Sequence, residues 1–147
     1  MPGPVERTRY ELTVDLPPSR VIATLVDFGQ NRVRIWRETS HPRVYRLHRL
    51  SEHQAEVTEG VPFAWSRERY DWSESGVVRL TQLESNVARN GIIQYEVRAA
   101  GRGSAIHCER YREFYGLRSR IVGTFMVAFG RRILRGQLLA GLRRATE

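Results

Sequence analysis

Carboxylate and guanidinium side chains recur in the middle of the chain at positions where strand periodicity turns them inward. Glu59 follows Ala55 and Val57 at spacings of two, so these three side chains share one face of a strand. A carboxylate removed from water needs a partner, and Arg69, or Arg67, lies beyond the next turn. We predict that Glu59 and Arg69 are neighbours on paired strands. There the arginine could meet a ligand carboxylate or enolate, with Glu59 as orienter or base.

Further acid–base candidates lie on later strands, and each also has an ordinary structural explanation. Asp71 and Arg110 could form a second pair, and His107 shares a strand face with Glu109. Such ion pairs more often serve structure than catalysis, and a histidine on a polar strand face is usually exposed. No nucleophile–histidine–acid series can be read from the sequence. The catalytic residues therefore stay unknown, with Glu59, Arg69, Asp71 and Arg110 as candidates.

Large aromatic side chains are spread over the elements that should enclose a binding site. Rings of this kind line ligand cavities, although they also pack well in a core with no void. With the two charged residues above, they make up the expected ligand-binding set: Trp36, Tyr45, Glu59, Arg69, Trp72, Tyr95, Phe125 and Phe129.

The composition is that of an ordinary globular protein, 41% hydrophobic and 27% charged over 147 residues. We expect one domain over residues 1–147, with residues 1–8 flexible or an extension of an edge strand. The single cysteine, Cys108, cannot form an internal disulfide. The four histidines show no metal-ligand spacing, so we expect neither a metal nor a cofactor. The absence of lysine excludes a Schiff-base or phosphate-loop lysine.

No segment has the features of a signal peptide or of an integral membrane span, so we expect a cytoplasmic protein. The net charge is +8, but most of it comes from arginines after residue 117. Neither a basic stripe interleaved with aromatic residues nor a known reading motif is present. We therefore expect no nucleic-acid partner, and we interpret the arginines as a solvated helix face.

Two periodicities divide the chain. The segments with strand-like alternation are residues 10–16, 44–50, 54–61, 64–73, 77–83, 92–100 and 105–114, with short turns between the last six. Two short helices are expected after the first strand, from Pro17 to Val26 and from Asn31 to Arg37. The pattern predicts an α+β fold with an antiparallel sheet. For residues 64–73 and 105–114 both faces are mixed, so the inward face stays open.

A long amphipathic helix is predicted from Leu117 to Arg144, with Ile121, Phe125 and Phe129 on its buried face. Gly123, Gly130 and Gly141 share one side of the helix, where small residues could leave room for a ligand or for close packing. The apolar face shifts after Gly130 to Leu134, Leu138 and Leu142. A bend, or a tail packed less firmly than the first half, is expected there.

The order of elements and several local sequences resemble the START-like SRPBCC superfamily, and within it the polyketide cyclase/dehydrase-type proteins common in actinobacteria. The resemblance covers roughly residues 9–144. It is carried by Glu59-Gly60, the run Tyr70-Asp71-Trp72-Ser73, Ser85-Asn86-Val87, Gly91, and the hairpin from Gly101 to Ile106 before the long helix. It implies a helix-grip fold, in which about seven antiparallel strands curl around the C-terminal helix and the two short helices close one end.

Three functions are consistent with that resemblance and with the residues. The first is binding of a small hydrophobic molecule, of lipid, polyketide or aromatic type, in a cavity between sheet and helix. The second is a cyclase/dehydrase-type enzyme, favoured by a desolvated carboxylate or histidine beside an arginine. The third is a partner- or membrane-surface-binding module that uses the basic C-terminal helix. A continuous apolar strip on residues 134–142 and no cavity would favour it. A homodimer is also compatible with the sequence.

Overall fold

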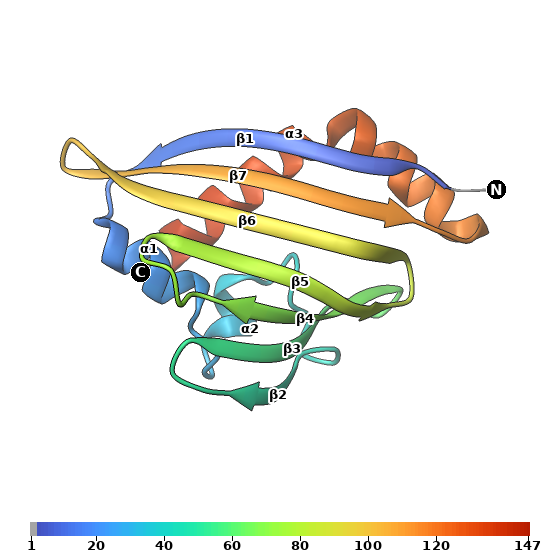
Figure 1. The fold of residues 1–147 in the computed structure, drawn as a ribbon, viewed down its shortest axis with the longest axis horizontal. Helices are drawn as coiled ribbons and strands as arrows, with labels where there is room; N and C mark the ends of the chain where they lie inside the picture. The colour runs from blue at the N-terminus through green and yellow to red at the C-terminus, as the bar shows by residue number, and fades with distance from the viewer. Residues whose placement is uncertain (1–2) are drawn as a thin grey trace.

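A computed structural model describes residues 3–147, apart from the side chains of residues 117 and 118. Its elements are, in chain order, β1 (Val5–Val14), α1 (Pro18–Leu25), α2 (Arg32–Ile35), β2 (Arg46–Leu50), β3 (Gln54–Val61), β4 (Ala64–Asp71), β5 (Val77–Ser85), β6 (Ala88–Ala100), β7 (Gly103–Phe114) and α3 (Leu117–Arg144). This order confirms the predicted α+β arrangement, in which two short helices follow the first strand and a long helix ends the chain (Figure 1).

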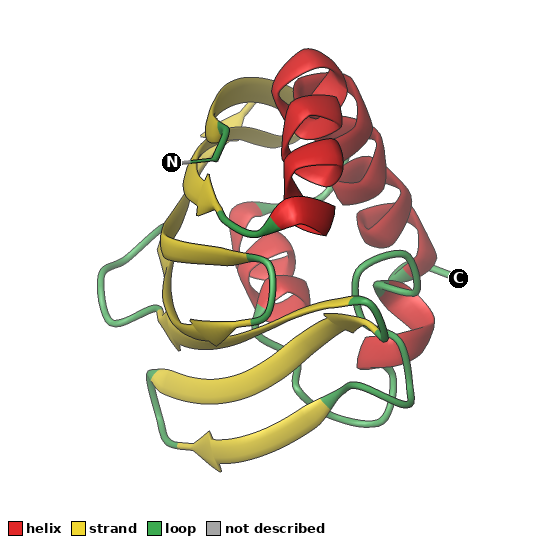
Figure 2. Cartoon of the chain, turned by 90° about the vertical axis from the view of Figure 1, so that its right-hand side faces the viewer, coloured by secondary structure: helices red, strands yellow, loops and turns green. Residues whose placement is uncertain are grey.

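The strands form one antiparallel sheet in the order β1-β7-β6-β5-β4-β3-β2. Short turns make each strand from β2 to β7 pair with its neighbour in sequence, and β1 adds to the free edge of β7. The sheet curves around the space in which the helices lie (Figure 2). The predicted helix-grip fold is therefore confirmed.

β1 begins earlier than the alternation at Tyr10 and Leu12 indicated. Its buried side chains are Glu6, Thr8, Tyr10 and Leu12, and Val5 already pairs with Glu113 of β7. Residues 5–8, expected to be flexible or an edge extension, thus extend the edge strand, while residues 1 and 2 lie outside the described part of the chain. This extension places the carboxylate of Glu6 on the concave face of the sheet.

The apolar residues of α3 that are buried lie mainly in its second half, whereas the first half was expected to be the more firmly packed. Leu138 and Leu142 in the second half are 4% and 1% exposed, whereas Phe125 and Phe129 in the first half are 52% and 55% exposed. The second half lies over α2, where Arg144 donates a hydrogen bond of 3.0 Å to the carbonyl of Ile35. The expectation of a loosely packed tail is therefore wrong, because the shifted apolar face is the one that meets the core.

Two glycines of α3 allow aromatic rings to lie directly on the helix backbone. A Cβ at Gly141 would overlap the six-membered ring of Trp36, and a Cβ at Gly123 would lie 2.8 Å from the ring of Phe114. Glycine costs about 1 kcal/mol relative to alanine inside a helix, and this close packing offsets the cost. Of the two explanations considered for the glycine positions, close packing accounts for these two.

Candidate functional site

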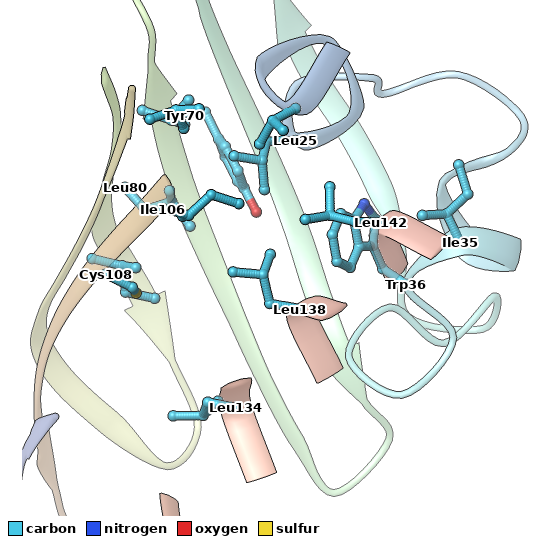
Figure 3. Packing of buried hydrophobic residues seen from close by; sticks show 14 of the residues in the cluster. Leu25, Ile35, Trp36, Tyr70, Leu80, Ile106, Cys108, Leu134, Leu138 and Leu142 are labelled. Atoms are coloured by element: carbon cyan, nitrogen blue, oxygen red, sulfur yellow. The ribbon is translucent and has the colours of Figure 1, made fainter. Parts of the chain in front are cut away.

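A cavity of about 280 Å³ lies between the concave face of the sheet and α3. Its volume is just below the lower end of the range typical of ligand-binding pockets, about 300–1,000 Å³. The apolar part of its wall comes from both helices and strands, and includes Leu25, Trp36, Leu80, Ile93, Phe114 and Leu138. Figure 3 shows Leu134 and Leu138 projecting from α3 toward the sheet, with Trp36 beside Leu142 at the far end of the helix. The cavity is therefore enclosed largely by hydrophobic side chains.

The polar part of the wall consists of paired charges. Three carboxylate–guanidinium pairs line the cavity, namely Glu59–Arg32, Glu6–Arg110 and Glu68–Arg112. Each carboxylate side chain is at most 12% exposed. Charged side chains are seldom buried unless they are paired, and the pairing here meets that requirement.

Arg32 joins the helical segment to the sheet. Its Nε and Nη2 atoms donate to the two carboxylate oxygens of Glu59 at 2.9 Å, and Nη2 also donates to the hydroxyl of Tyr70 at 2.9 Å. Its Nη1 donates to the carbonyls of Leu25 and Asp27. Because a guanidinium carries five N–H donors, these five hydrogen bonds use all of them.

Glu59 is held as a carboxylate by this cluster. It accepts a hydrogen bond of 2.6 Å from Tyr70 in addition to the two from Arg32. Burial acts to raise its pKa, but the charge of Arg32 and the hydrogen bonds from Arg32 and Tyr70 outweigh it, so the pKa is lowered overall. Burial together with the charge of Glu59 raises the pKa of Tyr70 well above its ordinary value. Tyr70 therefore keeps its proton and donates a hydrogen bond to Glu59.

The other two pairs are made across the curved sheet. On β7, Arg110 and Arg112 alternate with outward-facing residues, so both side chains lie on the concave face. Arg110 Nε donates to Glu6 Oε2 of β1 at 3.2 Å, and Arg112 Nη2 donates to Glu68 Oε1 of β4 at 3.0 Å. Glu6 lies directly opposite Arg112 in the pairing of β1 with β7. The four charges thus form a row across the cavity wall.

Burial opposes the charged forms of Glu68 and Arg112. Burial raises the pKa of Glu68, and the attraction of Arg112 does not fully compensate. Burial lowers the pKa of Arg112, and the like charge of Arg110 lowers it further. Both shifts favour the neutral forms of these two side chains.

Three polar atoms of cavity-lining residues are buried and have no hydrogen-bond partner in the described part of the chain. They are Glu6 Oε1, Arg112 Nε and Trp36 Nε1. Unpaired buried polar groups are costly and uncommon in folded proteins. All three belong to residues that line this one cavity.

The prediction that Glu59 and Arg69 are neighbours on paired strands is wrong. In the pairing of β3 with β4, Glu59 lies opposite Ser66, and Arg69 lies opposite Glu56, to which it donates at 3.2 Å. Arg69 is 46% exposed on the convex face. The sequence left the inward face of residues 64–73 open. The structure turns Ser66, Glu68 and Tyr70 inward, so the odd-numbered residue Arg69 faces solvent.

The predicted pair of Asp71 and Arg110 is also absent. Asp71 accepts hydrogen bonds from Ser73 and from Gln54 on the convex side of the sheet. The hydrogen bonds from Ser73, followed by that from Gln54, lower the pKa of Asp71 to about 2. Arg110 does line the cavity, but its partner is Glu6.

The predicted aromatic residues divide into three groups. Trp36 and Tyr95 line the cavity. Tyr45 and Trp72 lie outside the cavity lining and contact Phe28: the Tyr45 hydroxyl donates to the Phe28 carbonyl at 2.9 Å, and the Trp72 ring lies 6.0 Å from the Phe28 ring. A ligand-binding role for Trp36, Tyr95 and Glu59 stays a prediction.

Phe125 and Phe129 form the third group and do not line the cavity, contrary to expectation. Their rings pack against each other at 5.1 Å on the solvent side of α3. The inward positions of this half of the helix are instead Val122 and Met126. Since the first half of α3 carries apolar residues on both sides, its periodicity does not distinguish the buried side from the exposed one.

Several cavity residues were not identified from the sequence as site residues: Glu6, Arg32, Glu68, Tyr70 and Arg112. A signal for Arg32 was available, because it precedes the apolar Ile35 and Trp36 by three and four residues and so shares their helix face. A signal for Glu6 was also available, because it lies four residues before Tyr10 and so shares the same face of the strand. No comparable signal separates Glu68 and Arg112 from the outward-facing charges of their strands.

The described residues include no group of three or more His, Cys, Asp or Glu side chains placed to hold a metal ion. Within the same part of the chain, no helix combines the length and the apolar content needed to cross a membrane. The cavity wall, by contrast, offers arginine donors and carboxylates to a small organic molecule.

Comparisons with known proteins support the fold. No protein-family model matches the sequence, and no curated protein sequence matches it. Among solved structures, the protein TTHA0849 from Thermus thermophilus matches with a TM-score of 0.74 at 15% identity, over 96% of this chain and 97% of that one. The Zhui aromatase/cyclase from Streptomyces sp. R1128 matches with a TM-score of 0.70 at 12% identity, over 96% and 91%.

A third similar structure is norcoclaurine synthase from Thalictrum flavum in complex with dopamine and hydroxybenzaldehyde. Its TM-score is 0.66 at 9% identity, over 95% of this chain and 85% of that one. These matches cover nearly the whole chain, at identities that bear on fold alone. They confirm, at the level of the fold, the resemblance seen in the sequence. The chain therefore has the helix-grip fold, and the solved structures that it matches include SRPBCC-type proteins.

Proposed function

We propose that the protein binds a small hydrophobic molecule in the cavity between the sheet and α3. The observation that carries this proposal is the cavity itself, about 280 Å³ in volume and walled largely by aliphatic and aromatic side chains. A well-packed interior of this size would hold few voids larger than a water molecule. The norcoclaurine synthase of similar fold was solved in complex with dopamine and hydroxybenzaldehyde, which are small aromatic molecules.

The size of the cavity narrows the ligand class. A volume near the lower end of the range for ligand sites, about 300–1,000 Å³, suits a compact molecule of one or two fused rings. It suits an extended lipid chain less well. Of the lipid, polyketide and aromatic types considered, a small aromatic or polyketide-like ligand is therefore favoured.

A test compares two neighbouring isoleucines of β6. Ile93 lines the cavity and is 4% exposed, whereas Ile92 is 55% exposed on the convex face. Ile93→Trp should fill the cavity, and Ile92→Trp makes the same chemical change outside it. Equilibrium dialysis with 2-acetonaphthone, a compact two-ring probe, measures the dissociation constant of each protein.

We expect the wild type and Ile92→Trp to bind the probe alike, and Ile93→Trp to bind it at least tenfold more weakly. Circular dichroism should first show that both variants are folded, because overpacking a core can cost about 1–3 kcal/mol. Binding that is absent from the wild type, or unchanged in folded Ile93→Trp, would refute the proposal.

A second candidate function, an enzyme of cyclase/dehydrase type, is favoured by one observation. Glu68 is a buried carboxyl group with a raised pKa, and it lies in the cavity wall beside Arg112. Such a group can remain protonated at higher pH and donate its proton to a bound carbonyl compound. Turnover of an enolisable diketone that is lost in Glu68→Gln but kept in Glu84→Gln would support this function.

The third candidate, a partner- or membrane-binding surface on the basic C-terminal helix, lacks the observation that would favour it. Leu134, Leu138 and Leu142, which were to form an exposed apolar strip, are buried, and a cavity is present.

A further inference from the structure

Three arginines of the cavity wall differ in how many of their N–H donors are hydrogen-bonded to the protein. The inference drawn from this difference rests on the proposed ligand-binding function. Arg32, Arg110 and Arg112 all line the cavity and each pairs with one carboxylate. A guanidinium has five N–H donors, and a buried donor without a partner costs free energy.

Arg32 is saturated by the protein. Its five hydrogen bonds go to Glu59, Tyr70 and two backbone carbonyls, and its side chain is 4% exposed. It has no donor left for a ligand, so its role is to hold the segment around α2 against the sheet.

Arg110 and Arg112 are far from saturated. Among the described residues, Arg110 donates one hydrogen bond, from Nε to Glu6, and Arg112 donates one, from Nη2 to Glu68. Their side chains are 10% and 20% exposed, so the remaining donors are neither bonded to the protein nor freely solvated. The unpartnered and buried Nε of Arg112 belongs to this set.

The two arginines also lie next to each other and are paired in the same way. They lie two residues apart on β7, so their side chains emerge side by side on the concave face. Each carboxylate partner is bound through a single nitrogen rather than through the two-bond fork that Arg32 makes with Glu59. Glu6 and Glu68 therefore hold the two guanidinium groups in place and balance their charges. Most of the donors of these two cavity-lining arginines are left without a partner among the described residues.

We propose that Arg110 and Arg112 form the head-group site of the cavity. Its ligand is an apolar ring system that carries an acceptor oxygen group, a carbonyl or a carboxylate. Ile93 and Met126, which line the same cavity, supply the apolar contact for the rings. An acceptor oxygen between the two guanidinium groups would also reduce their mutual repulsion. A ligand that displaces water from this wall must replace the hydrogen bonds that the water made. Because the unpaired groups of the two arginines are all donors, the ligand must supply acceptor atoms.

The test uses three naphthalene probes of nearly the same shape. The probe 2-acetonaphthone carries a neutral acceptor, 2-naphthoate carries an anionic acceptor, and 2-isopropenylnaphthalene replaces the carbonyl oxygen by a CH₂ group. Equilibrium dialysis with the wild-type protein should give at least tenfold tighter binding for one or both acceptor probes than for 2-isopropenylnaphthalene. This factor corresponds to about 1.4 kcal/mol. Tighter binding of 2-naphthoate identifies an anionic head group, and tighter binding of 2-acetonaphthone identifies a neutral one.

Two conservative variants and one matched control locate the effect. Arg110→Lys and Arg112→Lys keep the charge needed by Glu6 and Glu68 but remove the planar fork of donors. Each should reduce the preference for the acceptor probe to less than about threefold, while binding of 2-isopropenylnaphthalene stays the same. Arg69→Lys makes the same change on the convex face, beside Glu56, and should keep the full preference.

The outcomes separate this inference from the function on which it rests. Equal binding of all three probes to the wild type would overturn the head-group site while leaving hydrophobic binding intact. A preference that survives in both lysine variants would overturn the assignment to Arg110 and Arg112. Failure of every probe to bind would overturn the proposed function, and this inference with it.

Discussion

Replacing Glu59 by glutamine should destabilise the protein strongly, because it removes the counter-ion of a buried arginine. The Arg32 side chain is 4% exposed, and two of its five hydrogen bonds go to Glu59. Glu59→Gln preserves the shape and one acceptor oxygen, but it leaves the charge of Arg32 without an opposite charge. Breaking a buried pair in this way costs about 3–5 kcal/mol.

The lower end of that range applies here. Three of the five hydrogen bonds of Arg32, to Leu25, Asp27 and Tyr70, do not involve Glu59. We therefore expect a loss of about 3 kcal/mol in the free energy of unfolding, measured by urea denaturation at pH 7. A protein of typical stability, about 5–15 kcal/mol, remains folded after such a loss.

Glu56→Gln is the matched control on the same strand. Glu56 also pairs with two arginines, Arg67 and Arg69, but these are 37% and 46% exposed on the convex face. Exposed pairs contribute little because water screens them, so this variant should lose much less stability than Glu59→Gln. Equal losses in the two variants would refute the argument from burial.

The pH dependence supplies a second check. Because the pKa of Glu59 is lowered in the folded protein, its contribution is present above the unfolded pKa, about 4.3. The contribution is lost as the pH falls through the folded value. The stability gap between the wild type and Glu59→Gln should therefore close in acid. In addition, the double variant Arg32→Met/Glu59→Leu should be more stable than either single variant.

Three further predictions test other parts of the structure. A hydrogen bond with Glu109, together with that of Glu11, raises the pKa of His107. The stability lost in His107→Gln should therefore be fully evident below about pH 6.5 and vanish as the pH rises through the folded pKa, which denaturation at several pH values would show. Gly136→Ala should raise the free energy of unfolding by about 0.5–1 kcal/mol, because no atom of the described residues lies within 4 Å of its Cβ position. Gly141→Ala should lower it, because its Cβ would meet Trp36. The Cys108 thiol is fully buried and burial raises its pKa to about 11, so it should react with a thiol reagent at pH 8 only after unfolding.

The elements of the fold could be predicted because local periodicity and turn residues determine them. The alternating segment 54–61 and the helix at 117–144 were predicted with the bounds that the structure gives. β1 and β6 were predicted too short, because Gly and Pro near the start and Asn90-Gly91 read as breaks. In the structure Asn90 and Gly91 form a bulge within β6, where Asn90 has a φ of 55° and the register with β7 shifts between Arg89 and Ile92. Gly3 and Pro4 directly precede β1, which pairs with β7 from Val5 onward.

The candidate site was predicted less well, because the buried faces of its strands carry charged side chains, whereas a buried face is normally recognised by its apolar residues. Glu68 and Arg112 lie on a buried face that also holds Tyr70 and Cys108. The opposite faces of the same strands carry charges too, so polarity cannot decide which face is inward. Only the curvature of the sheet, which brings β4 within reach of β7, turns these isolated charges into a pair. That long-range contact has no local signal.

Hydrogen bonding assigns different chemistry to two cavity carboxylates that look alike in the sequence. Glu59, the base first considered, accepts three hydrogen bonds and has a lowered pKa, so its lone pairs are engaged and its affinity for a proton is weak. Glu68 accepts one hydrogen bond from Arg112 among the described residues and has a raised pKa. If the cavity carries out acid–base chemistry, the proton therefore moves at Glu68, beside the arginines that would hold the ligand oxygen, while Glu59 and Arg32 keep the wall in place.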